Sequence, residues 1–347
     1  MSSELEFNFH DKVGLHIFTE DPRAIDFYTL EYGHHSGRVG DHLPRVCLNW
    51  QASNSPGKRL SGAVPHTHKI FARWTYSLSL DQDKITIHAT GNRFALPMVH
   101  HMLVHPSIRL LCSRRGMLLL HGSATARDGG SVIFTGRGGT GKTTASSILL
   151  SDNDARWQMH ADDYVFINPG EGTYAYLTRA HLYSDLLKIV PSVSKRLSIL
   201  EHIQIALYGS VRELSRDQIK WPVRIPLERL WPERTFCQTA SLTAILVLER
   251  SNKGSDIEIV PLADDLIVDD MLSMNFYEAR HFINLVAPFE DISWPENWLD
   301  DWRESEREAL IRIVNQTKIY NMRIPLDQKN TCATEEILRR EISGLYS

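Results

Sequence analysis

The sequence predicts an α/β protein in which a smaller β-rich domain, residues 1–115, precedes a larger α/β domain, residues 116–347. Three observations support this prediction. Short runs of β-branched and aromatic residues, separated by Gly, Pro, Asn and Ser, fill roughly the first ninety positions. A glycine-rich loop near residue 136 lies between a strand-like run and an apolar helical run. A length of 347 residues is enough for one large or two smaller domains.

Three strands and one long helix are expected in the N-terminal domain. Residues 13–18, 73–80 and 84–89 are rich in β-branched or aromatic residues, which predicts strands. Apolar residues recur at helical spacing over residues 94–115, and Pro106 is expected to kink or divide this helix. The N-terminal domain contains no phosphate-cradling loop, so the chemistry is expected in the second domain.

The second domain is expected to begin with a β-hairpin. The apolar runs 117–126 and 131–135 flank an Asp-Gly turn, and the second run leads into the glycine-rich loop and a helix. Residues 157–167 form another apolar pair of runs interrupted by two aspartates, which predicts two strands.

The remaining elements follow from the same patterns. The runs at 241–248 and 257–260 flank a Lys-Gly turn, which predicts a second hairpin. A helix near 298–314, a strand at 319–324 and a helix near 334–345 complete the chain.

The composition excludes several classes of protein. With 42% hydrophobic and 23% charged residues, the chain is neither disordered nor fibrous. The 38 basic and 42 acidic residues give a net charge of −4, so no nucleic-acid partner is expected. Four widely spaced cysteines argue against a disulfide framework or a zinc cage. A polar N-terminus and the lack of a run of about 18 apolar residues predict a cytoplasmic protein without a membrane partner.

The glycine-rich loop matches G-x-x-x-x-G-K-[ST], the P-loop or Walker A motif, at residues 136–143. Small residues allow successive backbone N–H groups to surround a phosphate, and the following helix adds its positive dipole end. Lys142 is expected to reach the β- and γ-phosphates of a nucleotide, and the Thr143 hydroxyl to bind Mg²⁺. The expected nucleotide-binding residues are Gly136, Arg137, Gly138, Gly139, Thr140, Gly141, Lys142, Thr143 and Thr144.

An acidic pair, Asp162 and Asp163, follows the loop after room for one helix and one strand. A Mg²⁺–nucleotide site needs a carboxylate at the end of a neighbouring strand, and adjacent residues of an extended chain face opposite sides. One aspartate is therefore expected to face the metal and the other the acceptor hydroxyl. A turn that uses both side chains for backbone hydrogen bonds is the alternative.

Together these motifs resemble the HPr kinase/phosphorylase superfamily. The resemblance rests on His121-Gly122-Ser123, the loop, and Ala161-Asp162-Asp163, in that order and at comparable spacing. It covers residues 117–170 and implies a phosphoenolpyruvate-carboxykinase-like P-loop kinase core that transfers a phosphoryl group to a hydroxyl, often a serine. It further implies ATP and Mg²⁺ as cofactors, His121 near the transferred phosphate, and assembly into a homo-oligomer.

One family signature is missing. An L-E-x-R-G-x-G-like segment is expected beyond the acidic pair, but residues 174–191 carry an unrelated sequence. The acceptor is therefore expected to be a peptide, a protein serine or a small-molecule alcohol other than HPr. Phosphoenolpyruvate carboxykinase shares the G-T-G-K-T-T sequence of residues 139–144, but this chain is too short for that enzyme.

The sequence leaves several roles open. The expected catalytic residues are Lys142, His121 and Asp162. Asp162 is expected to be the base, and Asp163 is expected to lie nearer the metal with Thr143. The alternative is the opposite assignment of the two aspartates. A nucleotide-binding regulatory protein with little transferase activity is the alternative function. Five basic residues are candidates for clamping the phosphoryl group: Arg137, Arg179, Lys220, Arg224 and Arg250.

Overall fold

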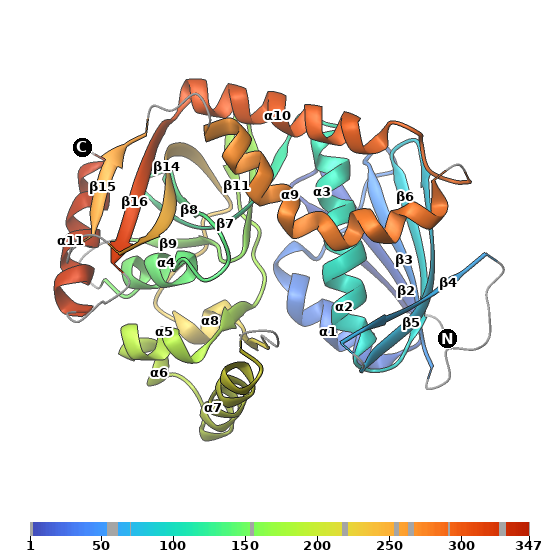
Figure 1. Cartoon of the computed structure of the whole chain (residues 1–347), viewed down its shortest axis with the longest axis horizontal. Coiled ribbons are helices and arrows are strands. Elements are labelled where there is room, and N and C mark those ends of the chain that lie inside the picture. The colour runs from blue at the N-terminus through green and yellow to red at the C-terminus, as the bar shows by residue number, and fades with distance from the viewer. Residues whose placement is uncertain are drawn as a thin grey trace. The chain divides into compact units, whose positions relative to one another are not determined.

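The chain divides into two compact units. A computed structural model describes residues 3–53, 62–69, 71–152, 156–216, 221–252, 257–262, 267–290, 292–325 and 331–346, with the backbone only for residues 331–334 (Figure 1). The first unit comprises Met1–Leu119 and Leu272–Leu310, and the second comprises Leu120–Met271 and Ile311–Ser347. Both units combine helices with mixed sheets, so the predicted α/β class is confirmed.

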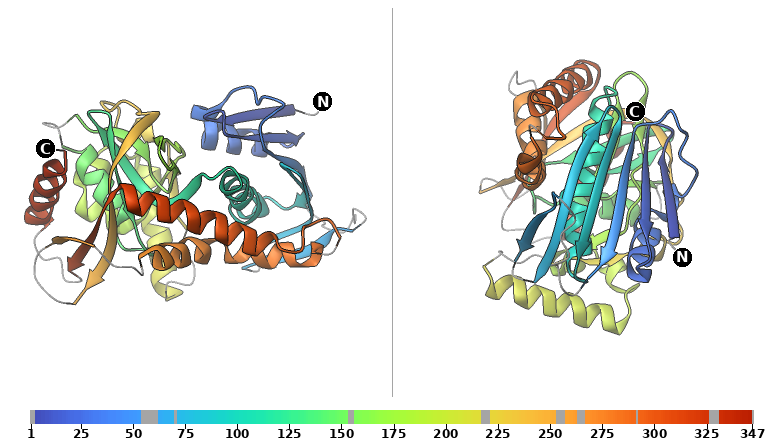
Figure 2. Two further views of the ribbon diagram at one scale, coloured as in Figure 1. Left: turned by 90° about the horizontal axis from the view of Figure 1, so that it is seen from above. Right: turned by 90° about the vertical axis from the view of Figure 1, so that its right-hand side faces the viewer.

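A six-stranded mixed sheet forms the first unit, in the order β1-β2-β3-β6-β5-β4 (Figure 2). Strands β2, β3 and β6 run parallel, and the remaining neighbours pair antiparallel. The strands are β1 (Ser3–Phe9), β2 (Val13–Thr19), β3 (Arg45–Ala52), β4 (Val64–His68), β5 (Ala72–Asp81) and β6 (Lys84–Gly91).

Helices pack on the apolar face of this sheet. Alternate residues such as Leu15, Ile17 and Leu48 are fully buried, as the two-residue period of a strand requires. The helices are α1 (Pro22–Tyr32), α2 (Ala95–Val99) and α3 (His105–Ser113), with a 3₁₀ turn η1 (Gly33–His35) and a π-helical turn η2 (His100–Val104). Pro106 lies in the first turn of α3, so it divides the predicted helix where the π-helical turn ends.

Two later helices, α9 (Ile267–Val286) and α10 (Trp298–Gln316), contribute residues 272–310 to the first unit, and the 3₁₀ turn η3 (Ala287–Phe289) lies between them. We expected this segment in the second domain, and that expectation was wrong. Tyr76 of β5 donates a hydrogen bond to the Leu285 carbonyl at 3.0 Å, and Arg109 of α3 pairs with Glu306 of α10. These contacts join residues about 200 positions apart, which no local pattern could reveal.

The second unit contains an eight-stranded sheet in the order β11-β10-β7-β8-β14-β16-β15, with β9 paired to β7. Its three central strands, β8, β14 and β16, run parallel. The strands are β7 (Leu118–Arg127), β8 (Gly130–Thr135), β9 (Gln158–Ala161), β10 (Tyr164–Asn168), β11 (Gly172–Tyr174), β14 (Thr239–Ser251), β15 (Glu258–Pro261) and β16 (Lys318–Pro325).

A separate two-stranded ladder and six helices complete the second unit. Helix α4 contacts both β8 and α11, and its apolar side chains belong to the buried core of the unit. These elements are α4 (Lys142–Leu150), β12 (Ala180–Leu182), α5 (Ser184–Ile189), α6 (Pro191–Ser194), α7 (Ile199–Leu214), β13 (Val223–Ile225), α8 (Leu227–Leu230) and α11 (Thr331–Gly344).

The predicted hairpin at residues 117–135 is present as β7 and β8, with Asp128 and Gly129 at positive φ in its turn. The predicted second hairpin is wrong, because β15 pairs antiparallel with β16 and not with β14. Both edges of β14 are already occupied, by β8 and by β16 in parallel register. Among the described helices, none is long and apolar enough to cross a membrane.

Candidate active site

The glycine-rich loop, residues 136–141, connects β8 to α4. Because β8, β14 and β16 are parallel, the loop leaves the carboxyl edge of the sheet, where α/β proteins commonly bind ligands. Gly141 precedes α4 in a left-handed conformation with φ 109°, and its carbonyl accepts from the Ala145 amide at 2.9 Å. The positive end of the α4 dipole therefore lies at the loop.

Three glycines show what the loop requires. A Cβ on Gly136 would lie 2.7 Å from the Leu248 carbonyl oxygen, so only glycine fits against β14. Gly139 has φ 85°, which disfavours a side chain, and a Cβ there would meet nothing within 4 Å. A Cβ on Gly138 would also meet nothing within 4 Å. The loop is thus packed on its inner side and open on its outer side, as a phosphate cradle must be.

The Lys142 side chain folds back over the loop. Its Nζ donates to the carbonyl oxygens of Gly136 at 3.0 Å and Arg137 at 3.4 Å, and the residue is only 8% exposed. The Thr140 hydroxyl donates to the same Arg137 carbonyl at 2.9 Å. These contacts hold the ammonium group beside the space that Gly138 and Gly139 leave open.

Asp162 lies between β9 and β10 and is 5% exposed. Its Oδ2 accepts from the His181 amide at 3.1 Å, and the Thr143 side chain lies close enough to this carboxyl group to lower its pKa. Burial raises the pKa of Asp162 to about 7, and the negative charge of Asp163 adds to this effect. A cation bound beside Asp162 would stabilise the ionised form of this carboxyl group.

Asp163 has a different environment. Its Oδ1 lies 3.4 Å from His121 Nε2, and its Oδ2 lies 3.7 Å from His181 Nδ1. Burial opposes ionisation, but the hydrogen bond from His121 and the charge of His181 lower the pKa of Asp163 well below its usual range. Asp163 is therefore ionised at neutral pH, and its side chain is 31% exposed.

Backbone pairing brings the three motifs together at one edge of the sheet. The Gly122 amide donates to the Asp163 carbonyl at 2.9 Å, and Ala124 of β7 is the register partner of Ala161 of β9. Thr135, the last residue of β8, donates its hydroxyl to the His121 carbonyl at 2.9 Å. The sequence-predicted residues His121, Asp162 and Asp163 thus lie together in the second unit, beside the loop.

Three of the five candidate basic residues, Arg137, Arg224 and Arg250, lie in or near this site. Arg224 of β13 is the register partner of His181 of β12. Arg250, at the end of β14, has a terminal nitrogen 3.8 Å from the position that a Cβ on Gly141 would take. Arg137 is an exposed residue of the loop itself, and Arg179 directly precedes β12. Lys220 lies outside the described residues.

A small apolar recess borders the loop beside α4. Gly141, Thr144 and Arg250 form its polar side. The other lining residues are apolar: Ala145, Ile148, Ile189, Ile257, Met322, Ile324 and Leu338. Thr144, predicted among the nucleotide-binding residues, therefore faces this recess.

His181 is a site residue that the sequence did not indicate. It lies on a three-residue strand, 18 positions after Asp163, without a neighbouring motif. Tyr183 lies close to the same carboxylates. Burial, and then the negative charge of Asp163, raise the pKa of Tyr183 to about 12. Of the two aspartates, Asp162 is the one whose pKa Thr143 lowers, whereas we expected Asp163 nearer the metal.

Comparison with known proteins adds no assignment: no protein-family model matches the chain, and a search of curated proteins finds no match.

Proposed function

We propose that the second unit is a phosphoenolpyruvate-carboxykinase-like P-loop kinase core that transfers the γ-phosphoryl group of ATP, with Mg²⁺, to a hydroxyl group of a peptide, protein or metabolite. One observation carries the proposal. The phosphate loop adjoins two carboxylates with different surroundings: Asp162 is buried near Thr143 and accepts from the His181 amide, and Asp163 lies between His121 and His181. A site that only binds a nucleotide has no use for the second carboxylate.

The loop suits a polyphosphate. Its outer side is open at Gly138 and Gly139, Lys142 Nζ lies over it, and the N-terminus of α4 points at it. Arg250 adds a second positive charge beside Gly141. The apolar recess next to Thr144 adjoins the loop, so it is where we place contacts with the nucleobase.

Thr143 and Asp162 fit a Mg²⁺ ion. A buried carboxyl whose pKa is raised to about 7 gains most from a neighbouring cation, and a hydroxyl beside it supplies a second hard oxygen ligand. Held by Thr143 and Asp162, Mg²⁺ would supply positive charge against the negative charge that develops during transfer. This assignment exchanges the roles that we expected for Asp162 and Asp163.

Asp163 is then the carboxylate for the acceptor. Its side chain is partly exposed, His121 Nε2 lies 3.4 Å from one oxygen, and His181 Nδ1 lies 3.7 Å from the other. An ionised carboxylate held in this way can orient an acceptor hydroxyl and take its proton as the bond to phosphorus forms. Most of the rate gain in phosphoryl transfer comes from positioning and charge neutralisation, so a weakly basic carboxylate suffices.

The direct test is Mg-ATP binding and turnover by the full chain and by Lys142→Ala. A hydrogen bond to a charged group contributes about 1.5–3 kcal/mol, so the variant should bind Mg-ATP about 10–150-fold more weakly while its circular dichroism spectrum is unchanged. Lys188→Ala, which removes an exposed lysine of α5 in the same unit, is the matched control and should bind as the wild type does.

Turnover then separates the two functions. Phosphate transfer from labelled ATP to hydroxyl-bearing peptides, proteins or polyols would establish a kinase. Tight Mg-ATP binding with neither transfer nor hydrolysis would favour the nucleotide-binding regulatory protein. Unchanged Mg-ATP affinity in folded Lys142→Ala would contradict the phosphate-loop assignment itself.

A further inference from the structure

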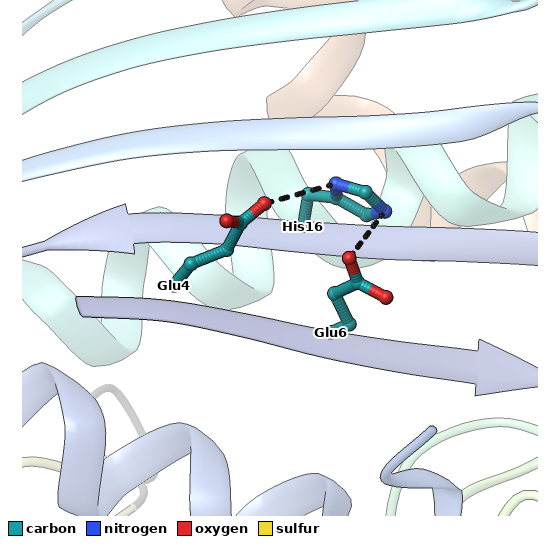
Figure 3. Close-up of side chains that lie close together, drawn as sticks. All are labelled: Glu4, Glu6 and His16. Atoms are coloured by element: carbon teal, nitrogen blue, oxygen red, sulfur yellow. Dashed lines mark ion pairs between the residues drawn. The ribbon is translucent and has the colours of Figure 1, made fainter. Parts of the chain in front are cut away.

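Two glutamates and a histidine of the first unit meet on one face of its sheet (Figure 3). Glu6 of β1 is the register partner of His16 of β2, and Glu4 lies two residues before Glu6 on the same face. Figure 3 shows both carboxylates turned toward the imidazole ring, one toward each nitrogen. This cluster belongs to no motif of the proposed kinase site.

His16 is buried without satisfying its ring. The residue is 8% exposed, and its Nε2 has no hydrogen-bond partner among the described residues. Nε2 lies 3.9 Å from Glu6 Oε1, and Nδ1 lies 3.8 Å from Glu4 Oε1. Both distances are too long for hydrogen bonds, and a buried polar atom without a partner is costly.

The spacing suits metal ligands better than hydrogen-bond partners. One donor atom from each of the three residues lies within 4.8 Å of the other two. Ligands about 2.0–2.1 Å from a tetrahedral metal ion are roughly 3.3–3.5 Å apart, so donor atoms up to 4.8 Å apart must approach one another by up to about 1.5 Å. The glutamate side chains are 53% and 29% exposed, so small rotations can close these gaps.

We propose that Glu4, Glu6 and His16 bind one divalent transition-metal ion of the Zn²⁺ class, with a water molecule in the fourth position. An imidazole nitrogen with two carboxylates is a donor set for such ions, whereas Mg²⁺ and Ca²⁺ prefer oxygen ligands only. The ion would join β1, the edge strand, to β2, which gives it a structural role in the first unit.

Surrounding groups are compatible with this ion. The Val39 amide donates to Glu6 Oε2 at 2.8 Å, which orients the carboxylate and leaves Oε1 facing His16. Arg45 and Lys84 are the nearby positive charges. The Arg45 guanidinium donates to the Asp41 carbonyl, so it has a hydrogen-bond partner outside the cluster.

The experiment is a titration of the full chain with Zn²⁺ by isothermal titration calorimetry. Excess Mg²⁺ is present, so that sites with only oxygen ligands are already occupied by Mg²⁺. The variants are Glu4→Gln, Glu6→Gln and His16→Gln. The matched control is Asp26→Asn, an exposed acid of α1 that makes the same charge change in the same unit. Co²⁺ absorption gives an independent readout of a site with a nitrogen ligand.

The wild-type chain and Asp26→Asn should each bind one Zn²⁺ at micromolar concentration, and each ligand variant should bind it at least 10-fold more weakly. The wild-type melting temperature should rise with Zn²⁺, and that of Glu6→Gln should not. Both glutamates are partly exposed, so their variants keep the test valid if His16→Gln fails to fold. No stoichiometric binding up to about 1 mM Zn²⁺, or equal affinity in wild type, Glu4→Gln and Glu6→Gln, would overturn the proposal.

Discussion

Each unit of the molecule buries ionisable groups. The two units differ in how completely the surrounding side chains supply these groups with ion-pair and hydrogen-bond partners. In the first unit, Arg109 and Glu306 are 2% and 0% exposed and form a two-pronged ion pair with N–O distances of 2.7 and 2.6 Å. Asn275 and Trp302 also donate to the Glu306 carboxylate, at 3.0 and 2.9 Å. Every acceptor position of this carboxylate is used by the protein.

In the second unit, the buried carboxyl group of Asp162 accepts from the His181 backbone amide and lies near Thr143. Its pKa is raised to about 7, first by burial and then by Asp163. Both units thus bury a carboxyl group, but only the first supplies it with a two-pronged cationic partner among the described residues. A hydrogen-bond network in which every charge is paired, as at Glu306, stabilises a fold. A buried carboxyl group without a paired cation, as at Asp162, favours cation binding.

The largest expected effect is on the catalytic rate, and it comes from the two aspartates of the second unit. Asp163→Asn should lower the rate of phosphoryl transfer about 10²–10⁴-fold, because the carboxylate that takes the hydroxyl proton is lost. Mg-ATP affinity should change only a few fold. Asp162→Asn should instead weaken Mg²⁺-dependent ATP binding, since Asp162 is the carboxylate beside Thr143. Calorimetric binding and single-turnover transfer measure both; the reverse result would return the two aspartates to the roles expected from the sequence.

The next effect tests the paired network around Glu306. Glu306→Ala leaves Arg109 charged and buried, which should lower the free energy of unfolding of the first unit by about 3–5 kcal/mol. The double variant Arg109→Met/Glu306→Leu removes both charges and should cost much less. Differential scanning calorimetry compares them. Equal losses in the two variants would show that packing, and not the unpaired charge, dominates at this position.

A third prediction concerns pH. Because the pKa of Asp162 is raised in the folded state, the folded chain binds this proton more tightly than the unfolded chain, and stability falls as pH rises from about 4 to about 7. The nucleotide-free Asp162→Asn protein should lack this loss and be more stable than wild type at pH 8, by up to about 4 kcal/mol. Asp163 contributes with the opposite sign, since its pKa is lowered. Denaturant unfolding at pH 5 and pH 8 measures the difference, and parallel pH profiles for the two proteins would refute it.

The smallest effect compares two glycines with the same backbone strain. Gly139 of the loop and Gly129 of the β7–β8 turn have φ of 85° and 79°, and a Cβ at either would meet nothing within 4 Å. Alanine at each should therefore cost a similar 1–2 kcal/mol or so of stability. Only Gly139→Ala should also weaken Mg-ATP binding, because its Cβ enters the space assigned to phosphate. Equal ATP affinity in the two variants would show that phosphate does not approach this part of the loop.

The local elements of the candidate site were predictable from the sequence. The β7–β8 hairpin follows from two apolar runs around Asp128 and Gly129, both of which adopt positive φ. The loop and the start of α4 at Lys142 follow from the motif, since glycine spacing and the helix start are properties of adjacent residues. The acidic pair lies between two short strands as expected.

The partners of those residues were not predictable. His181 lies beside Asp163 because β12 pairs with β13, a ladder that joins residues more than 40 positions apart. The same holds for β15, which pairs with β16 although β14 is nearer in the sequence. Neither pairing leaves a periodic pattern, because register between distant strands depends on which edges remain free.

The sequence by itself determined which residues we propose for phosphate-binding chemistry. Residue type and short-range spacing identify them: Gly136, Lys142, Thr143 and the two aspartates. Tertiary structure alone decided their electrostatics. It buried Asp162 against Thr143 and set His121 and His181 on Asp163, so that one pKa is raised and the other lowered in adjacent residues of the same type. It also moved residues 272–310 into the first unit and enclosed the Arg109–Glu306 pair there. The physical reason is that burial and charge proximity depend on distances in space, which a linear pattern of residues does not contain.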